Sequence, residues 1–178
     1  MIESLGVGVL SIEETSLTWS KAGTKNKVYT MFHKVWKNLS MNYSHIDEQF
    51  TADNQPGGTM TVVINDWTSR IQEKGIDPFG LGRWSYQVHR GKGGIKIMII
   101  SAYRVSQEYL SSVGPKTSVM QQFRSLSMQY RTANIKSEPN PRFQFLIDLH
   151  AWVEELIQQS YEIILCMDAN ESIDEQPG

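Results

Sequence analysis

The sequence predicts a single α/β domain built on a mixed β-sheet. At 178 residues the chain is long enough for one substantial hydrophobic core and too short for two domains. Its hydrophobic content of 40% and charged content of 20% are typical of globular proteins. Segments with strand character occur in hairpins and are interrupted by helical segments, which favours a mixed sheet over a strictly alternating parallel one.

The first half of the chain is predicted to hold three strands, one amphipathic helix and one short helix. Small and branched residues over 6–13 predict a strand that ends at Glu14. Apolar residues at three- and four-residue spacing predict an amphipathic helix over 24–39. A strand is predicted near 43–50, a second over 59–64, and a short helix over 66–72 that Asp66 caps and Gly75 ends.

The second half begins with a predicted hairpin whose antiparallel strands cover 84–90 and 95–101. A helix is expected to start near Pro115, and a second strong helical pattern covers 145–157. This second helix leads directly into the apolar run 163–167, which predicts a buried strand ending at Asp168.

Composition and termini restrict the function. The net charge of -2 gives no global attraction to polyanions, so nucleic-acid binding requires a local basic patch. The single cysteine, Cys166, excludes an internal disulfide and a cysteine-based zinc site, and its apolar surroundings predict a small buried hydrophobe. A signal peptide and a membrane-spanning segment are absent from the pattern, so we expect an intracellular protein, cytoplasmic or nuclear, that is neither secreted nor membrane-bound.

Acidic and amide side chains at strand ends indicate metal-dependent phosphate chemistry. Glu14 follows the first predicted strand, whereas Asp168 and Asn170 follow the last. Mg²⁺ prefers oxygen ligands and retains several waters, so one or two carboxylates and a substrate phosphate complete its site. Tyr103, at the end of another strand, adds a phenol that can donate to a phosphate oxygen. The alternative for each acid is an ordinary solvated carboxylate or a turn cap.

Several segments also resemble one protein family. Residues 13–19 (Glu-Glu-Thr-Ser-Leu-Thr-Trp) are similar to the Gln-Glu-Thr-Asn-Leu-x-Trp signature of the endonuclease/exonuclease/phosphatase superfamily, and 167–170 (Met-Asp-Ala-Asn) to its Gly-Asp-Phe-Asn signature. Residues 100–103 resemble its Asn-Val-Tyr strand end, and 57–59 and 82–84 its intervening hairpins. The resemblance covers nearly the whole chain and is closest to apurinic-site endonucleases and the endonucleases of non-LTR retrotransposons.

The resemblance implies a DNase I-like fold, in which a two-sheet mixed and antiparallel β-sandwich is flanked by helices. It implies a hydrolase that cleaves phosphodiesters with Mg²⁺ or Mn²⁺ and acts on DNA more readily than RNA. In this interpretation Glu14 is the metal ligand, Asp168 orients the attacking water, and Asn170 and Tyr103 contact the phosphate. Phospholipid head groups and inositol phosphates remain alternative substrates.

The chain also departs from the family pattern. Family members carry an Asn-bearing strand before the glutamate and a Ser-Asp-His motif after the Asp-x-Asn segment, and neither is found here. We therefore expect residues 1–178 to form one partial, incomplete domain that lacks the first strand and the C-terminal portion. Such a chain is either a hydrolase fragment or a catalytically inactive remnant or nucleic-acid-binding module of the same fold. Unpaired sheet edges would favour self-association.

The hairpin near residue 84 supplies candidate substrate contacts. Arg83 and Trp84 together offer a cation for the nucleic-acid backbone and a ring on which a base can stack. An ordinary solvated hairpin explains the same residues equally well. The sequence leaves both interpretations open.

Overall fold

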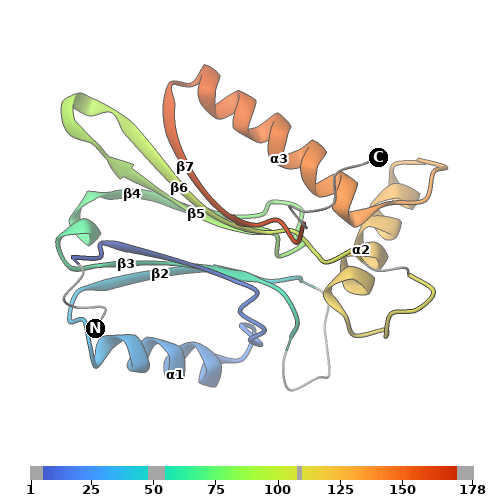
Figure 1. The fold of residues 1–178 in the computed structure, drawn as a ribbon, viewed down its shortest axis with the longest axis horizontal. Coiled ribbons are helices and arrows are strands. Elements are labelled where there is room, and N and C mark those ends of the chain that lie inside the picture. The colour runs from blue at the N-terminus through green and yellow to red at the C-terminus, as the bar shows by residue number, and fades with distance from the viewer. Residues whose placement is uncertain (1–5, 48–54, 108–109, 172–178) are drawn as a thin grey trace.

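Two β-sheets stack face to face, with helices on the outside, in the computed structural model, which describes residues 6–47, 55–107 and 110–171 (Figure 1). The first sheet has the antiparallel order β1-β3-β2. The second has the order β4-β5-β6-β7, in which only the β6–β7 pair is parallel. The strands are β1 (Val9–Glu13), β2 (Leu39–Ser44), β3 (Thr59–Ile64), β4 (Ile71–Ile76), β5 (Trp84–Arg90), β6 (Lys96–Tyr103) and β7 (Tyr161–Asp168). The predicted mixed α/β class is confirmed.

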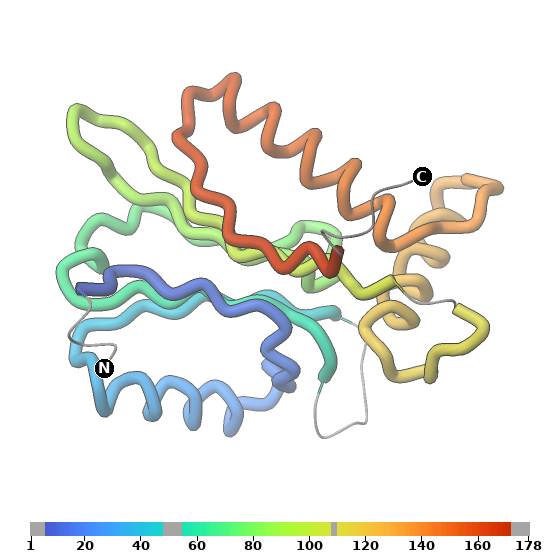
Figure 2. Tube along the Cα trace, in the orientation of Figure 1, coloured from blue at the N-terminus to red at the C-terminus, as the bar shows by residue number. Residues whose placement is uncertain are grey.

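Each sheet has its own helix on its outer face. Helix α1 (Ala22–His33) covers the first sheet, α3 (Pro141–Gln158) covers the second, and α2 (Ser118–Thr132) lies at one end of the sandwich (Figures 1 and 2). Two short 3₁₀ turns, η2 (Asn65–Arg70) and η3 (Lys92–Gly94), complete the elements. No helix within the described ranges combines the length and the apolar character that a bilayer crossing requires.

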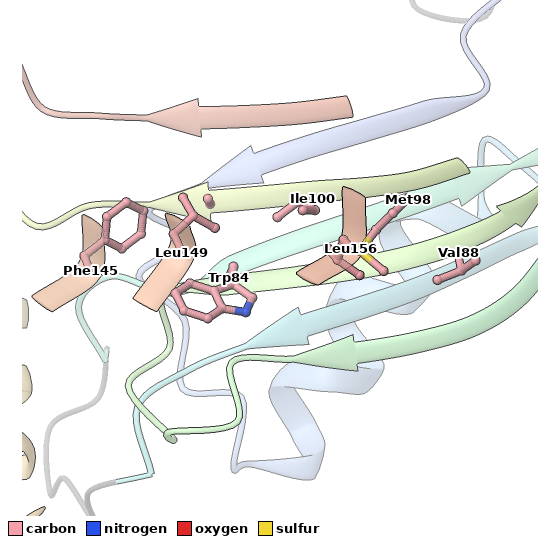
Figure 3. Close-up of a cluster of buried hydrophobic side chains, with 8 residues drawn as sticks. Trp84, Val88, Met98, Ile100, Phe145, Leu149 and Leu156 are labelled. Atoms are coloured by element: carbon pink, nitrogen blue, oxygen red, sulfur yellow. The ribbon is translucent and has the colours of Figure 1, made fainter. Parts of the chain in front are cut away.

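The larger apolar core lies between α3 and the second sheet. Its centre is Trp84, whose indole stacks on Trp152 at 5.6 Å between ring centroids and meets the edge of Phe145 at 6.0 Å. Figure 3 shows how the α3 side chains lie against those of β5 and β6. The fully buried members are Trp84, Val88, Met98, Ile100, Ala102, Phe145, Leu149 and Leu156. A second cluster, centred on Trp19 and Trp36, lies between α1 and the first sheet.

Hydroxyl groups join the two sheets to each other. Ser11 of β1 donates to Ser101 of β6, with 2.6 Å between the oxygens. Thr61 of β3 lies 2.8 Å from the Ser101 oxygen and 3.1 Å from that of Ser85, all three side chains being buried. The amide of Gln87 adds a bond of 3.1 Å to the Thr61 carbonyl. The hydroxyl groups of Thr61, Ser85 and Ser101 satisfy one another, so this polar layer is compatible with stability, although the Gln87 side-chain oxygen is buried without a hydrogen-bond partner within the described residues.

Several predicted boundaries differ from the structure. The first helix ends at His33 rather than near 39, because β2 already begins at Leu39 instead of in the predicted range 43–50. The short helix predicted over 66–72 is present as the 3₁₀ helix η2 (Asn65–Arg70), but Asp66 lies in its first turn rather than capping it, and β4 begins at Ile71. Gly75 does not end a helix but allows close packing, since a Cβ there would lie 2.2 Å from the Tyr86 ring. The antiparallel hairpin and the strands over 59–64 and up to Asp168 are confirmed.

Strand β7 is an edge strand and not the buried strand that its apolar sequence predicts. It pairs with β6 on one side, and Ile164 is 51% exposed. Leu165 and Met167 are also exposed, and Cys166 is half-buried rather than buried. Self-association through this edge stays a prediction, and its physical basis is an apolar strand that has a backbone edge to offer.

Candidate functional site

The ends of three strands meet at one end of the sandwich. The parallel register of β6 and β7 places Tyr103 directly beside Asp168. Strand β1 packs over β6 from the other sheet, and Glu14 at its end interacts with the Tyr103 phenol through its charge and a hydrogen bond. The structure therefore brings together Glu14, Tyr103 and Asp168, which lie 154 positions apart at the extremes.

Two glycines in the loop before β3, Gly57 and Gly58, fix the position of Glu14. The backbone N–H groups of Thr15 and Ser16 donate to the carbonyls of Gly58 and Gly57, at 3.1 and 2.9 Å. Gly58 has φ +82°, and a Cβ there would lie 2.8 Å from the Ser44 carbonyl oxygen. Glycine is thus required for this close approach. Glu14 itself has φ 48°, so the strand turns sharply at the residue whose carboxylate is exposed.

Tyr103 supplies a phenol that remains protonated. Its side chain is 2% exposed, and its oxygen lies 3.4 Å from the Ser118 oxygen at the start of α2. Burial, together with the nearby charges of Glu14 and Asp168 and the hydrogen bond to Glu14, raises the pKa of Tyr103 to about 12, although the bond to Ser118 acts in the opposite direction. A neutral phenol can donate a hydrogen bond to a phosphate oxygen but cannot act as a base near neutral pH.

The raised pKa of Tyr103 predicts an alkaline loss of stability. In the unfolded chain the Tyr103 phenol ionises near pH 10, whereas in the folded protein it keeps its proton. The stabilisation that is present below pH 10 is therefore lost as the pH rises towards 12. Between about pH 10 and 11 the wild type should lose about 1 kcal/mol more unfolding free energy than Tyr103→Phe. Urea titrations of both proteins across this pH range measure the difference. An equal dependence of the unfolding free energy on pH in the two proteins would contradict the prediction.

Asp168 and Asn170 form a tight turn after β7. The Asn170 N–H donates to Asp168 Oδ1 at 3.0 Å, and Asn170 has φ 48°. The Asn170 side-chain amide donates to the Arg104 carbonyl at 2.6 Å, and Arg142 donates to the Asn170 carbonyl at 3.3 Å. The side chain of Asn170 thus fastens this turn to the end of β6. Contact with a phosphate is a further role that these bonds do not test.

The oxygen donors present fit a magnesium ion that keeps most of its water. Glu14 and Asp168 offer two carboxylates, and one Asp168 oxygen already accepts from Asn170. Within 6–47, 55–107 and 110–171, no three His, Cys, Asp or Glu side chains are grouped as a metal cage. Two carboxylates suffice for Mg²⁺ when waters and a substrate phosphate complete the octahedron. Carboxylate oxygens of this kind suit hard cations such as Mg²⁺.

Arg83 and Trp84 are not available to a substrate, which corrects the prediction from sequence. Both side chains are buried, at 0% and 1% exposure. Arg83 Nε lies 2.7 Å from Asp77 Oδ2 and its Nη1 lies 2.6 Å from Asp148 Oδ2. Arg83 is held by its two ion pairs, and Trp84 is packed in the core beneath α3. Their role is structural.

Three residues near the site were missed by sequence reasoning. Arg104 follows Tyr103 directly, Arg142 lies in the first turn of α3, and Glu171 follows Asn170. The two arginines converge on the Glu171 carboxylate beside the turn that carries Asp168. Arg104 and Glu171 could have been found as neighbours of the candidate residues. The place of Arg142 depends on how α3 packs, which periodicity does not reveal.

Comparison with known proteins adds no assignment, because no protein-family model and no curated protein matches the chain.

Proposed function

We propose that the chain is a metal-dependent phosphodiester hydrolase with a DNase I-like arrangement, acting on DNA in preference to RNA in the cytoplasm or nucleus. The observation that carries the proposal is the meeting of Glu14, Tyr103 and Asp168 at one end of the two sheets. Two acids and a protonated phenol on rigid strand ends match the needs of phosphodiester cleavage, in which water must be oriented and negative charge stabilised. The resemblance of the surrounding motifs supports the same class.

Each side chain has a separate task in this proposal. Glu14 and Asp168 would hold Mg²⁺ or Mn²⁺, which when bound supplies charge neutralisation at the phosphate. Asp168, with one oxygen fixed by the Asn170 N–H, presents its other oxygen to an attacking water. Tyr103, which is 2% exposed and interacts with Glu14, would hold the Glu14 carboxylate in place, and it would donate to a phosphate oxygen only where the substrate replaces that interaction. Asn170 holds the turn that aims Asp168 and would add a phosphate contact.

A second candidate is a nucleic-acid-binding module without turnover. One observation favours it: the Asn170 amide is already bound to the Arg104 carbonyl, so it is less available to a phosphate. In this case the same end of the sandwich binds a phosphodiester and releases it unchanged. The two candidates share a substrate and differ in the effect of removing Asp168.

A plasmid-nicking assay separates the two candidates. Supercoiled DNA is incubated with the wild type, with Asp168→Ala and with Asp66→Ala, each in Mg²⁺ and in EDTA. Asp66 is an exposed acid on η2 and serves as the matched control. We expect wild-type nicking in Mg²⁺ that Asp66→Ala retains and Asp168→Ala lowers by at least about 100-fold. Equal rates for all three proteins would leave the binding module as the only candidate.

A further inference from the structure

A pocket of about 640 Å³ lies beside the turn that carries Asp168, and arginines form part of its wall. Arg104 comes from the end of β6, Arg142 from the first turn of α3, and Glu171 from the segment after β7. Arg142 Nη2 lies 2.7 Å from Glu171 Oε1, and Arg104 Nη1 pairs with the same oxygen. Two cations thus converge on a single carboxylate oxygen.

Both arginines are fixed before any ligand arrives. Arg142 Nη1 donates to the Val105 carbonyl at 2.5 Å, and Arg104 Nε donates to the Arg142 carbonyl at 3.3 Å. Their side chains are only 12% and 13% exposed, so each guanidinium has few alternative directions. An anion bound here would meet donors that are already ordered, which reduces the entropy lost on binding.

Glu171 is the most exposed member of this trio. Its side chain is 51% exposed, so it can leave the arginines for water at small cost. The hydrogen bond from Arg104 and the charge of Arg142 lower the pKa of Glu171. A phosphate group has more acceptor oxygens than a carboxylate and can meet the planar donors of both guanidinium groups. The two arginines and Glu171 carry one net positive charge, which Glu138 on the wall of the same pocket offsets.

We propose that Arg104 and Arg142 form a phosphate subsite for a phosphodiester backbone, and that Glu171 occupies it as a displaceable internal anion. The inference rests on the proposed function, because it assigns the subsite to a phosphate flanking the one at Glu14 and Asp168. The subsite and the candidate site are connected through the backbone, because the main-chain N–H of Arg104 donates to the main-chain carbonyl of Asp168 at 2.9 Å. Glu138 also lines this pocket, so a net positive charge develops there only when Glu171 leaves the two arginines.

A purely structural clasp predicts the opposite effect of one substitution. If the arginines serve only to hold the turn after β7, Glu171→Gln removes an ion pair and leaves DNA binding unchanged or weaker. If they form a phosphate subsite, Glu171→Gln removes a competing negative charge and strengthens binding. The sign of this change therefore tests the proposal even if Arg142 variants fold poorly.

The experiment measures binding without turnover. Fluorescence anisotropy of a labelled 20-base-pair DNA duplex is recorded in EDTA for the wild type, Glu171→Gln, Arg142→Lys, Arg142→Ala and Arg90→Ala. Arg90 is an exposed arginine at the end of β5 and is the matched control. Thermal unfolding of each variant shows whether it is folded, and inorganic phosphate is titrated as a second probe.

We expect Arg142→Ala to weaken duplex binding about tenfold, Arg142→Lys to weaken it less, and Glu171→Gln to strengthen it several-fold. The slope of log affinity against log salt should fall by about 0.9 in Arg142→Ala, as for one lost phosphate contact. Arg90→Ala should bind like the wild type. Inorganic phosphate should compete with the duplex and should do so more weakly in Arg142→Ala.

The failures of the two proposals are distinguishable. If Asp168→Ala abolishes nicking but Glu171→Gln and Arg142→Ala leave duplex affinity unchanged, the subsite is overturned and the hydrolase proposal stands. Binding that follows these two residues, combined with nicking that ignores Asp168, would support the subsite and overturn the hydrolase. Binding of inorganic phosphate that follows Arg142 while duplex affinity stays unchanged would overturn the backbone subsite in favour of a site for free phosphate.

Discussion

Replacement of Arg83 by methionine should destabilise the fold by about 3–5 kcal/mol, a large fraction of the stability of a domain of this size. Arg83 binds both carboxylate oxygens of Asp77, at 2.7 and 3.1 Å, and one of Asp148 at 2.6 Å. Asp77 is buried, and its carboxylate would remain in the interior without a counter-charge. The cost therefore comes from the acid left behind more than from the lost attraction.

Urea unfolding followed by circular dichroism measures this effect. Arg124→Met, at an exposed position of α2, is the matched control and should change the free energy of unfolding by less than about 0.5 kcal/mol. The double substitution Arg83→Met with Asp77→Asn should recover part of the loss, because the second change removes the uncompensated charge. A loss in Arg83→Met no greater than in Arg124→Met would contradict the buried ion pairs.

Trp84→Ala should cost about 3–5 kcal/mol by leaving a cavity in the larger core. The indole is 1% exposed, stacks on Trp152 and is covered by the Arg83 guanidinium at 4.4 Å from its ring centroid. Surrounding side chains come from both a helix and a sheet, so they cannot close the space without moving these elements apart. The lost area and the remaining void act in the same direction.

Trp84→Phe is the graded comparison for this prediction. It keeps an aromatic ring against Trp152 and removes an indole N–H that has no hydrogen-bond partner within the described ranges. We expect it to be clearly milder than Trp84→Ala in the same urea titration. Because Arg83 and Trp84 touch, the effects of Arg83→Met and Trp84→Ala should not add. Equal losses for alanine and phenylalanine would argue against a packed core here.

Strand and helix periodicity predicted most elements, since β3 and the hairpin of β5 and β6 follow the apolar pattern closely. It failed at β4, whose central residues Gln72 to Lys74 are polar and exposed at a sheet edge. Periodicity detects a buried face, and an exposed edge strand has little of one to detect. At β7 the strand itself was predicted but its burial was not, because an apolar run does not show whether a strand has a neighbour on one side or on both.

The candidate site divides along a similar line. Glu14, Tyr103 and Asp168 could be placed together because each marks a strand end. The register of β6 with β7 fixes Tyr103 beside Asp168, and the packing of β1 over β6 brings Glu14 to them. Arg83 looked like a surface cation because its partners, Asp77 and Asp148, are separated from it by 6 and 65 positions. Charge complementarity between elements depends on packing, which no local pattern contains. The same reason hid Arg142 from the sequence.

The hydroxyl layer between the sheets has a mechanical consequence. Hydrogen bonds are directional, so β1 cannot slide along β6 without breaking the contact of Ser11 with Ser101. Two sheets packed through apolar side chains alone could slide past each other and repack. Glu14 travels with one sheet and Asp168 with the other. The hydroxyl contacts between the sheets therefore fix the distance between two acidic side chains that belong to different sheets.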